Sequence, residues 1–229
     1  MRDKYDNFLH RLNQYRLRLN MTQEETGSEL GVTQSQFSKM ELGKIIIPYK
    51  VLVLLMKMGW DVDYFITGKE TCQSISELNL FMDGVEEKYR KELLSAVAWF
   101  LEQGINKCVL DISFETKCEI GILKKRASEE KFESVLYEAR KIAGIAQIPM
   151  SEKLGVNIKK YRKLEKEQLC PDAELLLRIY EETGCKPSLL FNCINVESLI
   201  INDLWNDITP PVRKSILSLV EQVYGFLKT

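Results

Sequence analysis

Two helix-start signals lie close together near the N-terminus of this 229-residue chain. Thr22 is followed three positions later by Glu25, and Thr33 by Gln36. Each pair has the spacing of a capping box, in which two side chains satisfy free backbone N–H groups at a helix start. Gly31 lies between the pairs and accepts the left-handed backbone that ends a helix. The pattern therefore predicts two short helices joined by a tight turn.

The residues around this pair have the apolar spacing of further helices. The two short helices are predicted at about 23–30 and 34–42, with Gly43 ending the second. Before them, apolar residues recur every three or four positions, as on one helix face: Leu9, Leu12, Tyr15 and Leu19. After them come another apolar helix and an aromatic cluster that closes a small core: Val51, Leu52, Leu54, Leu55, Met58, Trp60, Val62, Tyr64 and Phe65. This order is typical of a helix-turn-helix domain.

Composition limits the other classes of function. The formal net charge is -1, so a basic-tail mechanism is unsupported and any nucleic-acid face must be local. We find no transmembrane span or signal peptide and expect a cytoplasmic protein. The cysteines are scattered without a CxxC pair and are expected to be reduced: Cys72, Cys108, Cys118, Cys170, Cys185 and Cys193. With one histidine, His10, and no catalytic motif, we expect no metal, no cofactor and no enzymatic activity.

The middle of the chain is less regular. Residues 75–103 contain an amphipathic helix whose apolar face repeats every three or four positions. Near 109–122, Leu110, Ile112 and Phe114 alternate with polar residues, and two isoleucines flank Gly121. One or two short strands are predicted there, with an irregular linker as the alternative. A second amphipathic helix is predicted at about 208–227.

The second half of the chain repeats the first at an interval of 124 residues (165 − 41). The correspondence includes Leu30-Gly31-Val32 with Leu154-Gly155-Val156, and Glu41 with Glu165. We therefore predict a mainly all-α fold built by tandem duplication of a five-helix domain followed by an amphipathic helix. The predicted parts are an N-terminal helix-turn-helix domain, a helical linker or dimerisation region, a second degenerate helix-turn-helix domain and a C-terminal helix, at 1–70, 71–130, 131–195 and 196–229.

These residues resemble the Cro and phage-repressor type of helix-turn-helix, the XRE family, over about a quarter of the chain. The resemblance is carried by Arg16, Met21-Thr22-Gln23-Glu24-Glu25, Gly31-Val32-Thr33 and Glu41-Leu42-Gly43-Lys44. It implies a lambda-repressor-like fold whose recognition helix binds in the major groove of double-stranded DNA. The residues expected to contact DNA are Gln23, Thr33, Gln34, Ser35, Gln36, Ser38, Lys39 and Lys44. Arg16 and Glu41 are similar to the family's internal ion pair, and Arg140 and Glu165 have the same separation.

The second copy departs further from the family pattern. Ala146 stands where the first copy has its capping threonine, and Lys166-Glu167-Gln168 replaces Leu-Gly-Lys. Its recognition helix is strongly basic, so it is either a second DNA site or a solvated face of a packing domain. The residues of that second site would be Gln147, Lys159, Lys160 and Lys163.

The leading hypothesis is therefore a sequence-specific transcription regulator. The alternative is a protein-interaction module, such as an antitoxin or anti-repressor, that retains the helix-turn-helix fold without salt-sensitive binding to duplex DNA. Two assemblies would present two heads to DNA: a homodimer, which the sequence slightly favours, or a single chain that acts as a pseudo-dimer.

Overall fold

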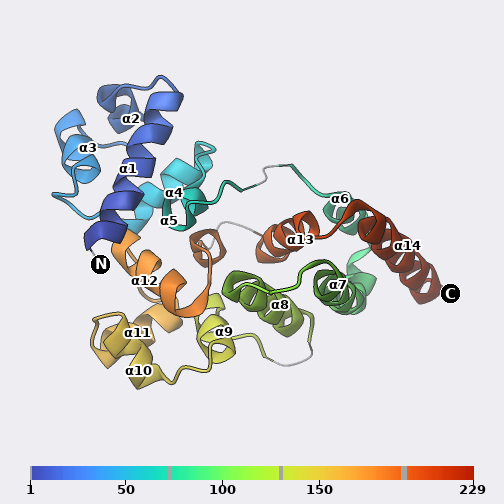
Figure 1. Cartoon of the computed structure of the whole chain (residues 1–229). Helices are drawn as coiled ribbons and strands as arrows, with labels where there is room; N and C mark the ends of the chain where they lie inside the picture. Colours follow the sequence, from blue (N-terminus) through green and yellow to red (C-terminus); the bar gives the residue numbers. More distant parts are fainter. Residues whose placement is uncertain (1, 72–73, 129–130, 192–194) are drawn as a thin grey trace. The chain divides into compact units, whose positions relative to one another are not determined.

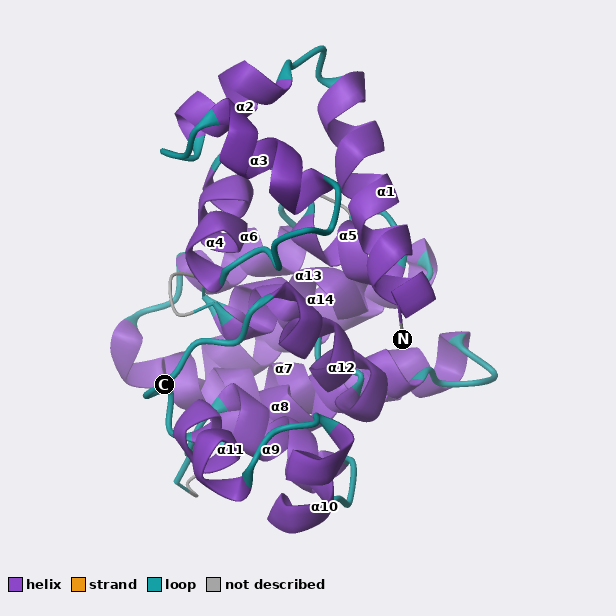
Figure 2. Ribbon diagram, turned by 90° about the vertical axis from the view of Figure 1, so that its left-hand side faces the viewer, coloured by secondary structure: helices purple, strands orange, loops and turns teal. Residues whose placement is uncertain are grey.

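The computed structural model describes residues 2–71, 74–128, 131–191 and 195–229, and no strand occurs in these ranges. The chain divides into two compact units (Figure 1). Unit 1 consists of residues 1–71, 147–182 and 186–191, and unit 2 of residues 72–146, 183–185 and 192–229. The prediction of an all-α fold is confirmed, and Figure 2 shows only helices and loops in the described part of the chain. No helix there is long and apolar enough to cross a membrane.

The first segment of unit 1 is the predicted five-helix domain. Its helices are α1 (Arg2–Arg18), α2 (Gln23–Glu29), α3 (Gln34–Glu41), α4 (Tyr49–Lys57) and α5 (Val62–Thr67). Phe8, Phe37 and Phe65 are almost completely buried, and Phe8 packs edge-on against Phe65 with ring centroids 5.9 Å apart. These residues come from α1, α3 and α5, and α1 contacts both other helices, so all three contribute to the buried core. We call residues 1–71 the N-terminal head.

The second segment of unit 1 contains α10 (Gln147–Lys153), α11 (Ile158–Glu165), α12 (Ala173–Thr183) and the 3-10 helix η1 (Pro187–Leu190). We call residues 147–191 the second head. Its first two helices have the lengths of α2 and α3 and start 124 residues later (147 − 23 and 158 − 34). The left-handed residues recur at the same interval, Gly31 with Gly155 and Gly43 with Glu167. Residues 131–146, expected to open the second domain, are grouped with unit 2.

Unit 2 is a helical cluster built around a long central helix. Its helices are α6 (Glu77–Asp83), α7 (Glu87–Cys108), α8 (Phe114–Ala127), α9 (Val135–Ile142), α13 (Val196–Asn206) and α14 (Pro210–Leu227). α7 contacts α8, α13 and α14, and it buries Leu93, Val97 and Leu101 completely or nearly so. The amphipathic segment predicted at 75–103 is thus two helices, α6 and α7.

The short strands predicted near 109–122 are wrong, because the segment from Phe114 onward is α8. Ser113 caps this helix by accepting a hydrogen bond from the Thr116 N–H at 3.1 Å. The alternation that suggested a strand has no buried face, since Leu110 is fully exposed and Phe114 is 45% exposed. Gly121 reflects a close helix contact instead, because a Cβ atom there would lie 2.6 Å from Cδ1 of Ile142 on α9.

The second predicted amphipathic helix corresponds to α14. Ile216 and Val220 are buried, but Leu219 is 42% exposed and Phe226 77% exposed. The sequence placed Ile216, Leu219 and Phe226 on one apolar face. The structure buries only part of that face within unit 2.

Candidate nucleic-acid interface

The turn between α2 and α3 is held by two reciprocal capping interactions. Thr22 Oγ1 accepts a hydrogen bond from the Glu25 N–H at 3.1 Å, and Glu25 Oε2 accepts one from the Thr22 N–H at 2.7 Å. At α3 the Gln36 N–H donates to Thr33 Oγ1 at 3.2 Å, and Gln36 Oε1 accepts from the Thr33 N–H at 2.9 Å. Both helices therefore begin at a residue fixed by local side-chain chemistry. Thr33 and Gln36, expected to contact DNA, have their side chains engaged in this cap.

Most of the residues expected to contact DNA form one polar surface along α3. Gln34, Ser35 and Lys39 are exposed on it, together with Thr33, Gln36 and, just after the helix, Lys44. Ser38 is half-buried, and so is Gln23 on α2. The opposite side of α3 carries the buried Phe37 and Met40. The surface is therefore rich in amide and hydroxyl groups and bears a single cation within the helix.

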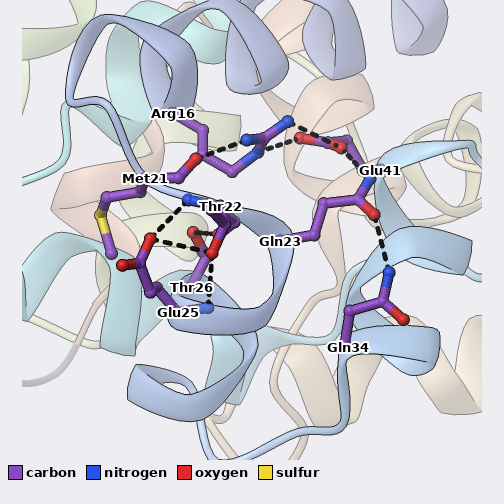
Figure 3. A network of polar contacts seen from close by, with 8 residues as sticks. All are labelled: Arg16, Met21, Thr22, Gln23, Glu25, Thr26, Gln34 and Glu41. Carbon is purple, nitrogen blue, oxygen red and sulfur yellow. Dashed lines mark hydrogen bonds and ion pairs between the residues drawn. The ribbon is translucent and has the colours of Figure 1, made fainter.

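A chain of hydrogen bonds connects this surface to the protein interior (Figure 3). Gln34 Nε2 donates to Gln23 Oε1 at 3.1 Å, and Gln23 Nε2 donates to Glu41 Oε2 at 2.6 Å. The two amides are thereby oriented, because each Nε2 atom is matched to a specific oxygen. The exposed Gln34 side chain is consequently positioned through α2 and is not simply a mobile surface group.

This series of hydrogen bonds ends inside the protein at a buried ion pair between α1 and α3. Arg16 Nε lies 2.8 Å from Glu41 Oε1, and the residues are 7% and 8% exposed. Arg16 also donates from a terminal guanidinium nitrogen to the Met21 carbonyl at 2.5 Å, which ties α1 to the residue before the α2 cap. This geometry gives Arg16 and Glu41 a structural position beneath the polar surface.

The environment of Glu41 favours its charged form. Burial raises the pKa of the Glu41 carboxyl, but hydrogen bonds from Arg16, Gln23 and Asn13 outweigh burial and leave the pKa below its ordinary value of 4.5. Glu41 is therefore ionised at neutral pH and orients Gln23. Asn13 was not identified from the sequence, since an isolated asparagine on a helix gives no pairing signal.

The second head reproduces the inner part of this arrangement. Gln147 Nε2 donates to Glu165 Oε2 at 2.5 Å, as Gln23 does to Glu41. The Tyr161 hydroxyl donates to Glu165 Oε1 at 2.8 Å. Separately, in unit 2, Arg140 donates to the Ile145 carbonyl at 2.7 Å, the counterpart of the Arg16–Met21 bond. The pairing of Arg140 with Glu165 stays a prediction.

The outer part differs between the heads. Ile158 stands at the position equivalent to Gln34 (34 + 124), so the second head has no outward amide there. The exposed residues of α11 are cations: Lys159, Lys160, Arg162 and Lys163. Glu165, the acidic residue of this helix, is buried. α11 therefore presents charge where α3 presents hydrogen-bonding groups.

A group of exposed apolar residues beside α3 was not predicted from the sequence. Leu42 is 63% exposed, Ile45 40% and Ile46 42%, while Ile47 is buried at 1%. Because three consecutive isoleucines read as core from the sequence, nothing in the pattern separates the two exposed ones from the buried one. They flank the C-terminal end of the polar surface.

The comparison with known families agrees with this geometry. Residues 12–58 match a family model described as helix-turn-helix. This stretch runs from within α1 to just past the end of α4 and includes the whole polar surface of α3. It is a helix-turn-helix domain of the Cro/repressor type, a kind that binds DNA in transcription regulators. No curated protein matches the chain, and neither does any solved structure.

The other candidate ligands of the chain are its acidic side chains, its histidine and its cysteines. In the described residues, no three His, Cys, Asp or Glu side chains gather as a metal-binding group. Cys108 is partly exposed, Cys170 is exposed, Cys118 and Cys185 are buried, and no disulfide joins any of these four. The remaining two cysteines, Cys72 and Cys193, lie outside the described residues.

Proposed function

We propose that this chain is a sequence-specific transcription regulator that reads double-stranded DNA through α3 of its N-terminal head. The observation that carries the proposal is the oriented amide of Gln34 at the exposed start of α3. In a helix-turn-helix, residues at the N-terminal end of the recognition helix reach base edges in the major groove. An oriented amide at this position suits direct readout.

The chemistry of the surface favours base contacts to purines. A glutamine binds adenine with one N–H and its carbonyl oxygen, and Gln34 donates only one of its two Nε2 hydrogens to Gln23. Lys39 lies further along α3 and can donate to guanine acceptors. Gln23 and Lys44, at the two ends of the surface, are expected to contact phosphates, and such contacts position the protein without specifying sequence.

The proposal includes a diverged duplication. Residues 147–191 keep the lengths of α2 and α3 in α10 and α11, the left-handed residues and the inner glutamine–glutamate bond of the N-terminal head. These are backbone and core features, which packing retains while surface residues change. The second head is therefore expected to keep the fold and to differ in what its recognition helix binds.

The test compares binding of the full chain to a duplex selected from a random pool and to an unrelated duplex, over a range of salt concentrations. Wild type should prefer the selected duplex, and Gln34→Ala/Lys39→Ala should lose that preference. Gln14→Ala/Lys57→Ala removes the same groups from exposed positions on α1 and α4 and should keep it. Absence of salt-dependent binding to any duplex would reject the proposal and leave a protein partner as the ligand.

A further inference from the structure

Unit 1 holds the two heads together through equivalent parts of each. The main-chain N–H of Ala173, at the start of α12, donates to the Ile47 carbonyl at 3.0 Å, just before α4. α12 begins 124 residues after α4 (173 − 49), so the contact joins corresponding helix starts. Both residues are buried, at 0% and 1% exposed. The beginning of α4 thus meets the beginning of its own counterpart.

The same relation holds more closely between α5 and η1. The segment 60–65 corresponds to 185–190, an interval of 125 residues (188 − 63), so that Asp63 and Ser188 are equivalent. Asp63 Oδ1 accepts a hydrogen bond from the Ser188 N–H at 2.9 Å, and Asp63 Oδ2 accepts one from the Ser188 hydroxyl at 2.5 Å. The two residues are 6% and 9% exposed. Equivalent residues therefore bind each other in a buried seam.

Contact between equivalent residues is the mark of a twofold arrangement. In an isologous dimer the same patch of both subunits is used, and residues on the axis meet their own copies. The seam between Asp63 and Ser188 reproduces this within one chain. Two further contacts join the heads without pairing equivalent residues: the rings of Tyr49 and Phe191 have centroids 5.3 Å apart, and Lys4 pairs with Glu181 at 2.6 Å.

The seam joins the two heads, and each head carries one recognition helix, α3 or α11. In both Figure 1 and Figure 2, α4, α5 and α12 lie between α3 and α11. Helix-turn-helix dimers place two such helices in major grooves about one helical turn apart. In the present chain the second helix, α11, brings exposed lysines and no counterpart of the Gln34 amide.

We infer that one chain is a two-headed DNA binder, in which α3 reads base sequence and α11 binds the phosphates of the adjacent half-site. This inference rests on the proposed function, and it replaces the homodimer favoured by the sequence with a single-chain assembly. The adjacent half-site would contribute affinity and salt dependence but little base preference, because lysine side chains of α11 act on phosphates as point charges.

The first test removes the α11 lysines from the full chain as Lys159→Ala/Lys160→Ala/Lys163→Ala. The slope of log affinity against log salt is negative, and each lost phosphate contact reduces its magnitude by about 0.9. Loss of all three contacts should reduce the magnitude of the slope by about 2 to 3, and the preferred sequence should stay the same. Lys107→Ala/Lys117→Ala/Lys214→Ala removes equal charge from exposed positions of unit 2 and should leave the slope nearly unchanged.

The second measurement is the number of chains on one selected duplex, by sedimentation of the labelled complex. One chain per site is expected. If wild type binds specifically but two chains occupy each site, or if the α11 variant keeps the wild-type slope, the inference fails while the proposed function stands. If wild type shows no salt-dependent duplex binding, both fail.

The seam itself provides a variant that separates folding from assembly. Asp63→Ser alone should shorten the protected length of duplex, because two serines cannot replace the carboxylate contacts. The exchange Asp63→Ser/Ser188→Asp should restore the wild-type footprint, since equivalent positions on a twofold axis are interchangeable. If the exchange variant folds but keeps the shortened footprint, the twofold arrangement is wrong.

Discussion

In the N-terminal head α2 and α3 have the same lengths as α10 and α11 in the second head, but the ends of these helices differ. α2 begins with a capping threonine, and the residue after Leu42 at the end of α3 is Gly43 with φ 68°. α10 follows Ala146, and the residue equivalent to Gly43 is Glu167, which adopts φ 56°. The same backbone is thus formed with and without the residues that favour it. Core packing and the part-buried glutamine–glutamate bond are what the two heads have in common.

Pro149 explains one of these differences. It is the third residue of α10, at the position where Glu25 of α2 supplies the N–H that Thr22 accepts. Proline has no N–H, so a threonine at position 146 could not make the same bond. The loss of the capping threonine therefore costs the second head less than the roughly 1 kcal/mol that the loss of a capping residue typically costs. Because Pro149 already removes the N–H that a cap would bind, the absence of threonine at position 146 has little further effect on stability.

The largest effect is expected at Glu41, whose hydrogen bond with Gln23 recurs in the second head between Glu165 and Gln147. Glu41→Ala would leave the buried Arg16 guanidinium without its carboxylate, which should cost about 3 kcal/mol or more of unfolding free energy. Urea unfolding of the full chain measures this. Glu24→Ala, an exposed carboxylate on α2, is the control and should change stability by less than about 0.5 kcal/mol. A loss of similar size for both variants would contradict a structural role for the ion pair.

Acid should weaken the same interaction. Because the folded pKa of Glu41 lies below its ordinary 4.5, its contribution is fully present above about that pH and is lost as pH falls through the folded pKa. Wild type should therefore exceed Glu41→Gln in stability at pH 7, and the difference should shrink at lower pH. Urea midpoints of both proteins across this range provide the measurement. A difference independent of pH would contradict the ionised pair.

The next effect separates the heads by function. Gln34→Ala should reduce the preference for the selected duplex by about 10-fold or more, because a bidentate base contact provides about 1–3 kcal/mol of discrimination. Lys163→Ala, at the position equivalent to Lys39, should weaken binding to selected and unrelated duplexes alike. Competition binding at fixed salt distinguishes the two patterns. Loss of preference in the Lys163 variant would show that α11 also reads bases.

Substitutions just after α3 and just after α11 are expected to change stability in opposite directions. Glu167→Gly should raise stability by about 0.5–1 kcal/mol, because glycine relieves the left-handed conformation. Gly43→Ala should lower stability by about 1 kcal/mol or more, since its Cβ would also lie 2.8 Å from Cδ1 of Leu9. Thermal unfolding checks both. A destabilised Glu167→Gly variant would mean that the Glu167 side chain makes a compensating contact.

The smallest effect concerns the missing cap. Ala146→Thr alone should change stability by less than about 0.5 kcal/mol, whereas Ala146→Thr/Pro149→Glu should gain more by rebuilding the capping box of α2. Urea midpoints of both variants give the comparison. An equal gain from the single substitution would show that proline does not block the cap.

Much of the N-terminal head could be predicted because its signals are local. Thr22, Thr33 and Gly43 each mark a helix boundary through interactions with neighbouring residues, and their spacing specifies the motif. Around residues 109–122 the local signal was misleading, since the apolar alternation of Leu110 and Phe114 coincides with a loop and a helix start. The segment instead forms α8, whose contacts with α7, α9 and α13 have no signal in the local pattern.

The candidate site was partly predictable for the same reason. The sequence identified the exposed residues of α3 and the Arg16–Glu41 pair through their fixed positions in the motif. It could not reveal the bond between Gln23 and Gln34, or that between Asp63 and Ser188, because each depends on side-chain geometry between separate helices. The seam in unit 1 in particular joins residues 125 positions apart (188 − 63).

The most direct measurement is the selection of bound duplexes from a random pool by the full chain. If α3 reads bases and α11 binds phosphates as proposed, the selected site is a base-specific half-site next to a segment of about one helical turn without base preference. Gln34→Ala/Lys39→Ala should abolish the specific half. A palindromic site with equal preference in both halves would contradict the single-chain account and indicate two N-terminal heads from two chains. No enriched sequence at all would contradict the regulator itself.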